Sequence, residues 1–367
     1  MPASAFHFLG REPTESGTGS MKADTNPGSG RRRLIAASIA GLALSVAGLA
    51  AAAHGQADEV RRLPKPVRTY AELKRETRLT KPAAIALGEM AVDVAGKQWP
   101  TTVSFRCYAA GGHVVSGEAA PAPTKVFDNV YFVGSADVSS WAIDTPEGII
   151  LIDAQTTEED AQRYVIDGLR KLGLDPTRIK YILITHEHFD HYGGASLIKR
   201  LSGARIAMSE PAWAALEKMP ASTKSPIPAR DMVINDGDVV TLGGERVTSV
   251  FTPGHTPGTF SFIFPVMAKG VVHNAALWGG NGFPQKVKDR KIFLQAIDHF
   301  AEATSRENVD VELAIHGDTD DLNARLARVG KGGPNPFLVG RDAYLRYEEV
   351  YRLCSRARME ERGDFGS

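Results

Sequence analysis

The sequence is short of three things: net charge, cysteine and internal repetition. Lysine plus arginine and aspartate plus glutamate each number 43, so the formal net charge is zero. A nucleic-acid-binding protein needs a basic surface, and this balance gives no sign of one. No segment recurs at a fixed short period. The function therefore has to be sought in a local group of residues rather than in bulk properties.

Long apolar runs are also scarce, and the most prominent one lies near the N-terminus. Residues 1–30 are rich in Gly, Ser, Thr and Pro, a composition that predicts disorder. Arg31, Arg32 and Arg33 then precede an Ala- and Leu-rich stretch at 34–53, and small residues follow. This order is typical of a secretory signal peptide, and the paired arginines resemble a twin-arginine signal.

We predict that residues 1–57 are a leader and signal peptide, removed on export to the periplasm or the cell exterior. The mature protein would then have no stable membrane association. The alternative is a retained membrane anchor, because the apolar stretch is close to spanning length. Met21 is an alternative start to Met1, because it lies at a more usual distance from the arginines.

The two cysteines are Cys107 and Cys354. An exported chain meets an oxidising compartment, where two cysteines can pair. A bridge would tie the start of the folded region to its last helix. We favour this disulfide over the alternative of two buried free thiols.

From residue 125 to 367 the sequence alternates strand-like and helix-like segments, whereas residues 58–124 form an N-terminal lead-in to which we assign no chemistry. Runs of β-branched and aromatic residues predict strands, and apolar residues at helical spacing predict helices. A capping box is expected at Thr156 and Glu159. Strands are expected at residues 126–133, 140–144, 148–153, 179–184, 204–208, 260–264, 271–278 and 311–315, and two more within 239–250 around LGGE. Helices are expected at 70–84, 157–172, 195–201, 210–219, 288–303 and 341–362.

The segment ITHEHFDHYGG, residues 184–194, holds three of the ten histidines within six positions. It follows a buried strand and precedes a helix, so it lies in a strand-to-helix loop, where α/β proteins place functional groups. In an extended segment His186 and His188 point the same way, whereas Asp190 and His191 lie past a turn and face a second position.

This motif supplies zinc ligands, since imidazole and carboxylate groups bind zinc and similar metals. A catalytic zinc takes three protein ligands and keeps one position open for water, so the motif begins two sites and completes neither. Among the other histidines, His255 and His316 lie at a tight turn and at a strand end. His273 and His299 fall within regular elements, and the rest lie in the leader or the lead-in. The candidate ligand sets are His186, His188 and His255, and Asp190, His191 and His316.

The motif THEHFDH, the later TPGHTPG around His255 and the strand-end His316 together resemble the metallo-β-lactamase superfamily over residues 126–328. The resemblance implies an α/β fold, a four-layer αβ/βα sandwich with the metals between two sheets at one edge. It also implies two zinc ions per chain and a zinc-bound hydroxide as the nucleophile, with Asp190 binding the second zinc and orienting that nucleophile. The protein would thus be a metal-dependent hydrolase of a small-molecule substrate, of unknown oligomeric state.

The absence of acidic residues and cysteine from one segment narrows the resemblance to one subclass. Residues 260–287 contain no Asp, Glu or Cys. The aspartate that bridges both metals in many superfamily hydrolases is therefore missing, and so is the cysteine ligand of some β-lactamases. A first site of three histidines and a second site of Asp, His and His resemble the third subclass of metallo-β-lactamases. The segment 330–354 resembles a branch of exported proteins close to that subclass.

One loop departs from that subclass. Residues 277–286, LWGGNGFPQK, contain no serine, although third-subclass enzymes usually hold the substrate carboxylate with serines at this place. Asn281 is the candidate substrate-binding donor in the loop. The alternative is that Asn281 is an ordinary turn asparagine between glycines.

Four neighbours of the candidate ligands are given roles of their own. Phe189 and Tyr192 either line the substrate pocket or pack the loop. Glu187 is expected to be a solvated charge or a support for the ligands rather than a ligand. Asp153 is expected to anchor the ligand loop through hydrogen bonds.

The leading function is that of an exported β-lactamase, which opens the β-lactam amide and confers antibiotic resistance. A zinc-dependent lactonase or esterase of the same fold is the first alternative. A non-catalytic exported zinc-binding protein is the second. We disfavour the second alternative because all six candidate ligands are present, whereas a decayed site would be expected to lose one.

Overall fold

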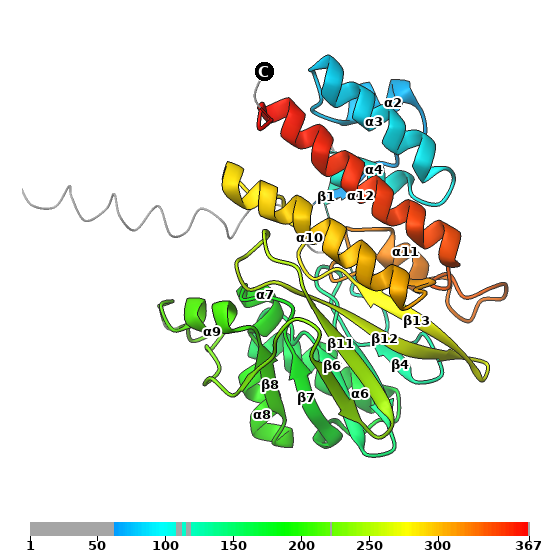
Figure 1. The fold of residues 1–367 in the computed structure, drawn as a ribbon. Helices are drawn as coiled ribbons and strands as arrows, with labels where there is room; N and C mark the ends of the chain where they lie inside the picture. The colour runs from blue at the N-terminus through cyan, green and yellow to red at the C-terminus, as the bar shows by residue number, and fades with distance from the viewer. Residues whose placement is uncertain (1–61, 108–111, 115–118, 221, 366–367) are drawn as a thin grey trace, which may run out of the picture. The chain divides into compact units, whose positions relative to one another are not determined.

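The structure is a computed structural model that describes residues 62–365, apart from 108–111, 115–118 and 221 (Figure 1). The leader predicted at residues 1–57 lies outside the described residues. Residues 59–367 form one compact unit. Within the described part of that unit, no helix is both long and apolar enough to cross a membrane.

The first sheet has seven strands in the order β3-β4-β5-β6-β7-β8-β9, which is also their order along the chain. Its first four strands pair antiparallel, and the pairs from β6 to β9 are parallel. The apolar β6 is buried throughout, as expected for a strand covered on both faces. The strands are β3 (Thr124–Lys125), β4 (Val130–Phe132), β5 (Trp141–Thr145), β6 (Gly148–Ile152), β7 (Ile179–Leu183), β8 (Arg205–Met208) and β9 (Met232–Val233).

The second sheet has five strands in the order β10-β11-β12-β13-β14. All its pairs are antiparallel except β13 with β14, which is parallel because the long helix α10 connects the two strands. A separate two-stranded sheet pairs β1 (Arg62–Pro64) with β2 (Gly112–Val114). The five strands are β10 (Val239–Leu242), β11 (Glu245–Phe251), β12 (Phe260–Ala268), β13 (Val271–Leu277) and β14 (Val311–Leu313).

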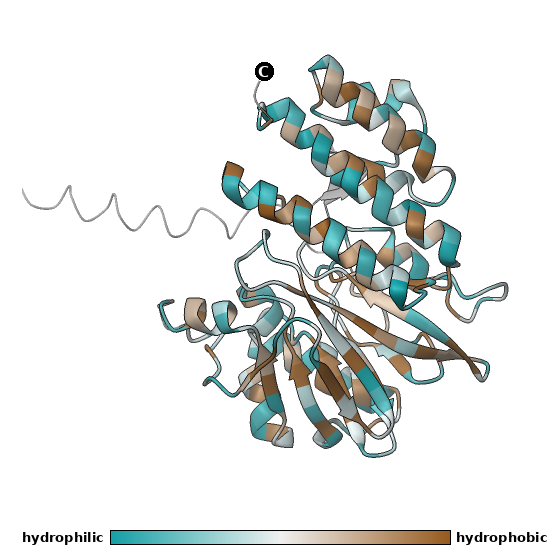
Figure 2. Cartoon of the chain, viewed as in Figure 1, coloured by the Kyte–Doolittle hydropathy of each residue, from teal (hydrophilic) through white to brown (hydrophobic). Residues whose placement is uncertain are grey.

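The two sheets face each other across an apolar core. Phe132 and Trp141 of the first sheet pack in the same cluster as Phe260, Phe262 and Leu277 of the second. The indole nitrogen of Trp141 donates to a carbonyl oxygen just after β14, at 3.0 Å, so the sheets are also joined by a buried hydrogen bond. In Figure 2, apolar residues are prominent on the strands.

Helices cover the outer face of each sheet (Figure 1). The order helix, sheet, sheet, helix is the four-layer αβ/βα sandwich that the sequence predicts, and this prediction is confirmed. The seven-stranded sheet is covered by α5 (Glu158–Asp160), η1 (Ala161–Ile166), α6 (Asp167–Lys171), α8 (Ala195–Ser202) and α9 (Glu210–Leu216). The five-stranded sheet is covered by α10 (Val287–Arg306) and α12 (Arg341–Arg362), and α3 (Pro82–Ala95) and α4 (Pro100–Arg106) pack against α12. The remaining helical segments are α2 (Tyr70–Glu76), η2 (Pro176–Arg178), α7 (Phe189–Tyr192) and α11 (Leu322–Leu326).

Two local predictions are wrong. The helix expected at residues 70–84 is divided into α2 and α3, because Pro82 starts a new helix and disfavours helical backbone in the residue before it. The cap expected at Thr156 lies one residue later. Thr157 is the N-cap of α5, where its hydroxyl accepts a hydrogen bond from the backbone of Asp160.

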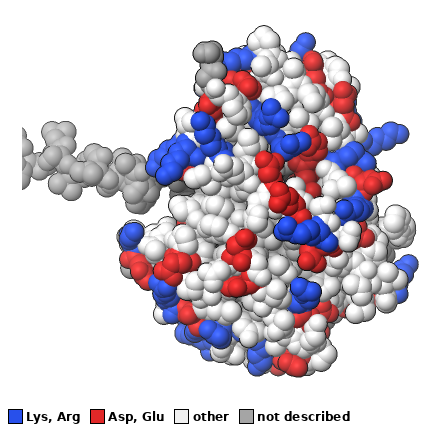
Figure 3. All heavy atoms as spheres, viewed as in Figure 1, with Lys and Arg blue, Asp and Glu red and all other residues white. Residues whose placement is uncertain are grey.

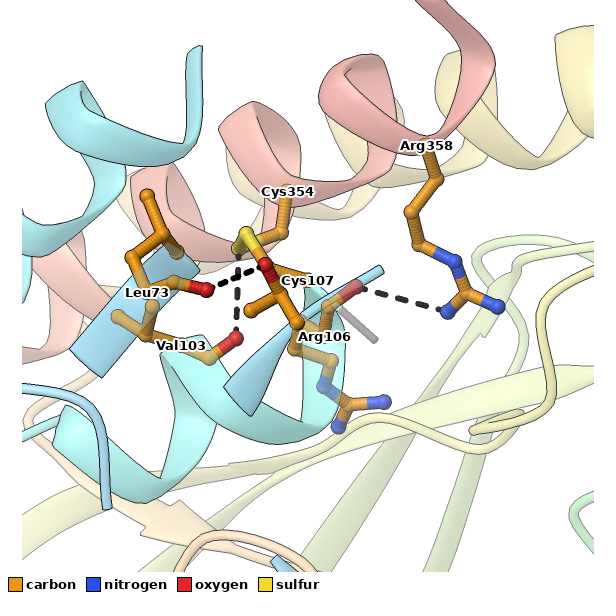
Figure 4. Close-up of a disulfide and its surroundings, with 7 residues drawn as sticks. Leu73, Val103, Arg106, Cys107, Cys354 and Arg358 are labelled. Carbon is orange, nitrogen blue, oxygen red and sulfur yellow. Dashed lines mark hydrogen bonds between the residues drawn. A yellow bond between two sulfur atoms is a disulfide. The ribbon is translucent and has the colours of Figure 1, made fainter. Parts of the chain in front are cut away.

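The predicted disulfide is confirmed. Cys107, which follows α4, is bonded to Cys354 in α12, and both residues are fully buried (Figure 4). The bridge therefore joins the N-terminal helices to the last helix of the chain. On the face drawn in Figure 3, basic and acidic side chains of the described residues are intermixed, in keeping with the zero net charge.

Candidate metal centre

The loop that carries the clustered histidines starts at the end of β7, where the two sheets meet. The carbonyl oxygen of Thr185 accepts a hydrogen bond at 2.7 Å from the backbone of Phe260, the first residue of β12. The single turn α7 follows and ends at Gly193. A Cβ atom at Gly193 would lie 1.9 Å from the carbonyl oxygen of Thr156, so only glycine lets the turn pack this closely.

The first candidate set, His186, His188 and His255, converges on one point. The Nε2 atom of His186 lies 3.1 Å from Nδ1 of His188 and 3.2 Å from Nε2 of His255. The third side of this triangle, between His255 Nε2 and His188 Nδ1, is also 3.2 Å. His186 is buried, His255 is half-buried and His188 is exposed, so one side of the triangle is open to a ligand from outside.

The second candidate set, Asp190, His191 and His316, converges beside the first. The Nε2 atoms of His191 and His316 are 3.2 Å apart. Oδ2 of Asp190 lies 3.6 Å from the first of these atoms and 3.8 Å from the second. The ligand atoms of His186, Asp190 and His191 all lie within 4.8 Å of one another, so the two sets are adjacent.

Hydrogen bonds at the far side of each ring set the histidine tautomers. Nδ1 of His255 donates to the carbonyl oxygen of Gly282 at 2.8 Å, and Nδ1 of His316 donates to that of Asp137 at 3.0 Å. Nδ1 of His191 donates to the Asp153 carboxylate at 2.7 Å. In a neutral imidazole the other nitrogen then carries a lone pair. These three rings therefore present their Nε2 lone pairs to the centre.

This arrangement fits a bound cation. The lone pairs of His191 and His316 face each other at 3.2 Å with no proton to place between them, which is repulsive unless a cation lies there. Tetrahedral zinc with Zn–N bonds of about 2.0–2.1 Å holds its nitrogen ligands roughly 3.3 Å apart. The first triangle has nearly these edges. The donor set, five imidazoles and one carboxylate, is also chemically suited to zinc.

The surroundings keep the imidazoles neutral. Burial lowers the pKa of His186 well below its usual range, and the neighbouring imidazoles lower it further. Burial is again the main cause for His255, whose pKa falls to about 3. A histidine binds a metal only in its neutral form, so both residues are ready to bind at neutral pH.

Asp153 supports both sets from behind, as the sequence predicts. It is buried at the end of β6 with a positive φ of 59°, a strained conformation for a residue with a side chain. Its carboxylate accepts a hydrogen bond from the His191 ring nitrogen and another, at 2.8 Å, from the backbone N–H of Thr185. The Thr185 hydroxyl in turn lies 3.1 Å from Nδ1 of His186. One carboxylate thus orients a histidine of each set.

Glu187 is a buried support and not a solvated charge. Only 3% of it is exposed, and its carboxylate accepts a hydrogen bond of 2.7 Å from the Thr256 hydroxyl. Thr256 follows His255 directly, so this bond joins the two segments that carry the first set. Burial raises the pKa of Glu187.

The three predicted substrate-binding residues lie in different surroundings. Phe189 is 51% exposed beside His188, where a substrate can reach it. Tyr192 is 3% exposed and packs in the core between the first sheet and its helices, so its ring lines no open surface. Asn281 is 9% exposed, and its Oδ1 accepts a hydrogen bond from Arg106 rather than facing the ligand sets. Tyr192 therefore follows the alternative that it packs against the protein interior. The Nδ2 donor of Asn281 is buried and has no hydrogen-bond partner among the described residues.

Sequence reasoning missed Arg106, which contacts the loops behind the centre from the lead-in to which no chemistry was assigned. Its guanidinium contacts the loop after β13 and the turn after β14. An arginine at the end of a short helix has no motif of its own. The one local signal was its position next to Cys107, the residue predicted to be bridged to the last helix.

Comparisons with known proteins agree with this geometry. The family model described as the metallo-beta-lactamase superfamily matches residues 133–267. Among solved structures, the native FEZ-1 metallo-beta-lactamase from Legionella gormanii is 25% identical, with a TM-score of 0.59 over 68% of this chain and 98% of that one. BJP-1, a subclass B3 metallo-beta-lactamase of Bradyrhizobium japonicum, is 25% identical, with a TM-score of 0.56 over 67% and 97%.

Curated relatives carry another name, hydroxyacylglutathione hydrolase. The protein of Maricaulis maris is 35% identical over 46% of this chain and 72% of its own length. That of Ectopseudomonas mendocina is 30% identical over 41% of this chain and 57% of its own length. That of Chelativorans is matched over only 42% of its length. Several of these sequence matches thus span about half of the relative or less.

Proposed function

The chain belongs to the metallo-β-lactamase superfamily, and we propose that it is an exported dinuclear zinc hydrolase that opens the amide of β-lactams. The observation that carries this proposal is the pair of adjacent ligand sets, one of three histidines and one of Asp190, His191 and His316. Residues 260–287 offer no acidic side chain to bridge them. The solved structures that resemble the chain over nearly their whole length include subclass B3 metallo-beta-lactamases.

The chain's own residues would have separate roles in this hydrolysis. When bound, zinc supplies Lewis acidity, which polarises a carbonyl group and makes water a nucleophile near neutral pH. Asp190 is the one acid among the six residues, with its Oδ2 3.6 Å from Nε2 of His191, and it would help to hold the second zinc and orient the nucleophile. Asp153 and the Gly282 carbonyl oxygen hold His191 and His255 in the tautomers that bind metal. Neither a serine nor a cysteine nucleophile is required.

A second candidate is hydrolysis of a lactone, ester or thioester by the same residues. Two observations favour it. The curated relatives are named hydroxyacylglutathione hydrolases. The loop after β13 has no serine to hold a carboxylate. The third candidate, a zinc-binding protein without turnover, is disfavoured by the convergence of all six ligands.

Export remains part of the proposal. The basic, apolar and small-residue order of the first 57 residues supports a signal peptide. The disulfide between Cys107 and Cys354 supports an oxidising location, since such bonds are rare in the cytosol. The periplasm or the cell exterior would meet both conditions.

The test is hydrolysis of a chromogenic cephalosporin by the zinc-loaded protein that starts at residue 58. Turnover that stops with a chelator, returns with zinc and is lost in Asp190→Ala would support the β-lactamase. The matched control is Asp298→Ala, an exposed aspartate on α10, which should keep full activity.

The same preparation should be offered a lactone, an aryl ester and an acylated glutathione thioester. Two zinc ions per chain with turnover of one of these, and none of the cephalosporin, would replace the β-lactam with the second candidate. Two bound zinc ions without turnover of any of these substrates would favour the third candidate, a zinc-binding protein without catalytic activity.

A further inference from the structure

Arg106, the last residue of α4, lies where four parts of the molecule meet. Its side chain is buried, and its guanidinium donates to Oδ1 of Asn281 at 2.9 Å. It also forms an ion pair with Oδ2 of Asp320 at 3.3 Å. The hydroxyl of Tyr351 in α12 accepts a third hydrogen bond at 3.1 Å, and the guanidinium carbon lies 4.0 Å from the centre of that ring. One cation from an N-terminal helix thus joins α12 and two loops.

The first of these loops holds His255. Asn281 stands between Gly280 and Gly282, which lie against the His255 ring: a Cβ at Gly282 would be 2.5 Å from Cε1 of that ring. The carbonyl oxygen of Gly282 also accepts the hydrogen bond that fixes the His255 tautomer. A shift of the Asn281 side chain would therefore move the surface on which His255 rests.

The second loop holds His316. The hydroxyl and backbone N–H of Thr319 both donate to the carbonyl oxygen of His316, at 3.0 and 3.3 Å. Asp320 comes next in the chain and accepts a hydrogen bond of 2.7 Å from the hydroxyl of Thr102, also in α4. Arg106 and Thr102 together hold this turn from one helix.

We propose that Arg106 is a positioning residue of the metal centre, which holds the loops behind His255 and His316 in register so that both ligand sets close together. The inference rests on the proposed function in one respect, that these six residues bind metal. It assigns a role to a helix outside residues 133–267, the part that the family model matches. Arg106 touches none of the six ligands and acts through Asn281 and Asp320.

The physical reason is the low polarity of the surroundings. A buried guanidinium paired with a buried carboxylate tolerates little displacement, because either charge left alone is strongly penalised. The disulfide at the next residue keeps the end of α4 against α12, and in Figure 4 the Arg106 side chain points away from that bridge. The loops are therefore set by a cation whose own backbone is covalently held.

The experiment compares Arg106→Met and Arg106→Lys with the wild type by two measurements. Competition with a chromophoric chelator gives both zinc dissociation constants, and the visible absorption spectrum of the cobalt(II)-loaded protein reports ligand geometry. For Arg106→Met we expect both zinc sites to weaken by roughly 10- to 100-fold, as for other residues that orient ligands, and the cobalt bands to change. Arg106→Lys should recover part of the affinity.

The control is Arg178→Met. Arg178 lies at the opposite end of β7 from the ligand loop, where it pairs with Asp144 at 3.1 Å. It should leave the zinc affinities and the cobalt spectrum unchanged. A folded Arg106→Met protein with wild-type zinc affinities and an unchanged cobalt spectrum would overturn the inference.

If Arg106→Met does not fold, two milder variants test the positioning role of Arg106. Asn281→Ala should weaken the first set more, and Asp320→Asn the second set more. Equal or absent effects of these two would overturn the inference. A wild-type protein that binds no zinc would instead overturn the proposed metal centre itself, so the two failures are distinguishable.

Discussion

The helices that cover the two sheets differ in what they bury. Those over the seven-stranded sheet bury apolar side chains, such as Val165, Ile198 and Trp213. Those on the side of the five-stranded sheet bury charged groups as well, Arg106, Arg290 and Glu348, and they carry the disulfide. The first cover is held by the hydrophobic effect, which tolerates small shifts. The second adds directional and covalent bonds, which do not, and it stands behind the loops of His255 and His316.

The largest effect is expected from breaking a buried ion pair that ties α11 to the five-stranded sheet. Arg325 in α11 pairs with Glu312 in β14, and both side chains are buried. Arg325→Met leaves Glu312 without its partner and should lower the free energy of unfolding by about 3–5 kcal/mol in urea titration. The matched variant on the first side, Arg200→Met, removes an exposed pair with Glu158 and should cost less than about 1 kcal/mol. Similar losses in the two variants would erase the contrast.

Removal of the disulfide should have the next largest effect. Cys107→Ser combined with Cys354→Ser frees the end of α4 and should lower the free energy of unfolding by about 2–5 kcal/mol. Because these are the chain's two cysteines, a reductant should lower the melting temperature of the wild type and leave the double variant unaffected. If the reductant leaves the melting temperature of the wild type unchanged, the disulfide does not stabilise the protein.

A pH-dependent effect is expected at Glu348 in α12. Burial is the main cause that raises its pKa to about 7, and the Thr304 hydrogen bond and the charge of Arg341 oppose the rise. The raised pKa means that folding favours the protonated form. Its contribution to stability is therefore complete below about pH 4.5 and is lost as pH rises to 7. Glu348→Gln should match the wild type near pH 4.5 and exceed it by up to about 3 kcal/mol at pH 8.

The smallest effect belongs to the apolar side. Ile198→Val in α8 removes one buried methylene group and should lower the free energy of unfolding by about 0.5–1.5 kcal/mol. Because no titrating group is involved, this loss should be the same at pH 5 and pH 8. A loss that changes with pH would mean that the first cover also depends on charge.

The same contrast explains how far the sequence could be followed. The ligand residues and the sandwich were accessible because the spacing of His186, His188 and His191, and the alternation of strands and helices, are local patterns. The partners of Arg106 lie 175 and 214 positions along the chain, and no local pattern encodes such contacts. For the same reason Asn281 reads as a surface turn, whereas the fold directs it inward. The capping error at Thr156 arose because two overlapping segments fit one motif.

The glycines behind His255 also limit how this protein could be re-engineered. Placing serines in the loop after β13, in imitation of third-subclass β-lactamases, means adding Cβ atoms where there is no room. At Gly280 such an atom would lie 2.7 Å from Cβ of His255, and at Gly279 it would lie 1.7 Å from a backbone oxygen of Phe260. Laboratory evolution toward a new substrate should therefore not accept substitutions at these glycines. We expect accepted substitutions to accumulate at open positions such as Phe189.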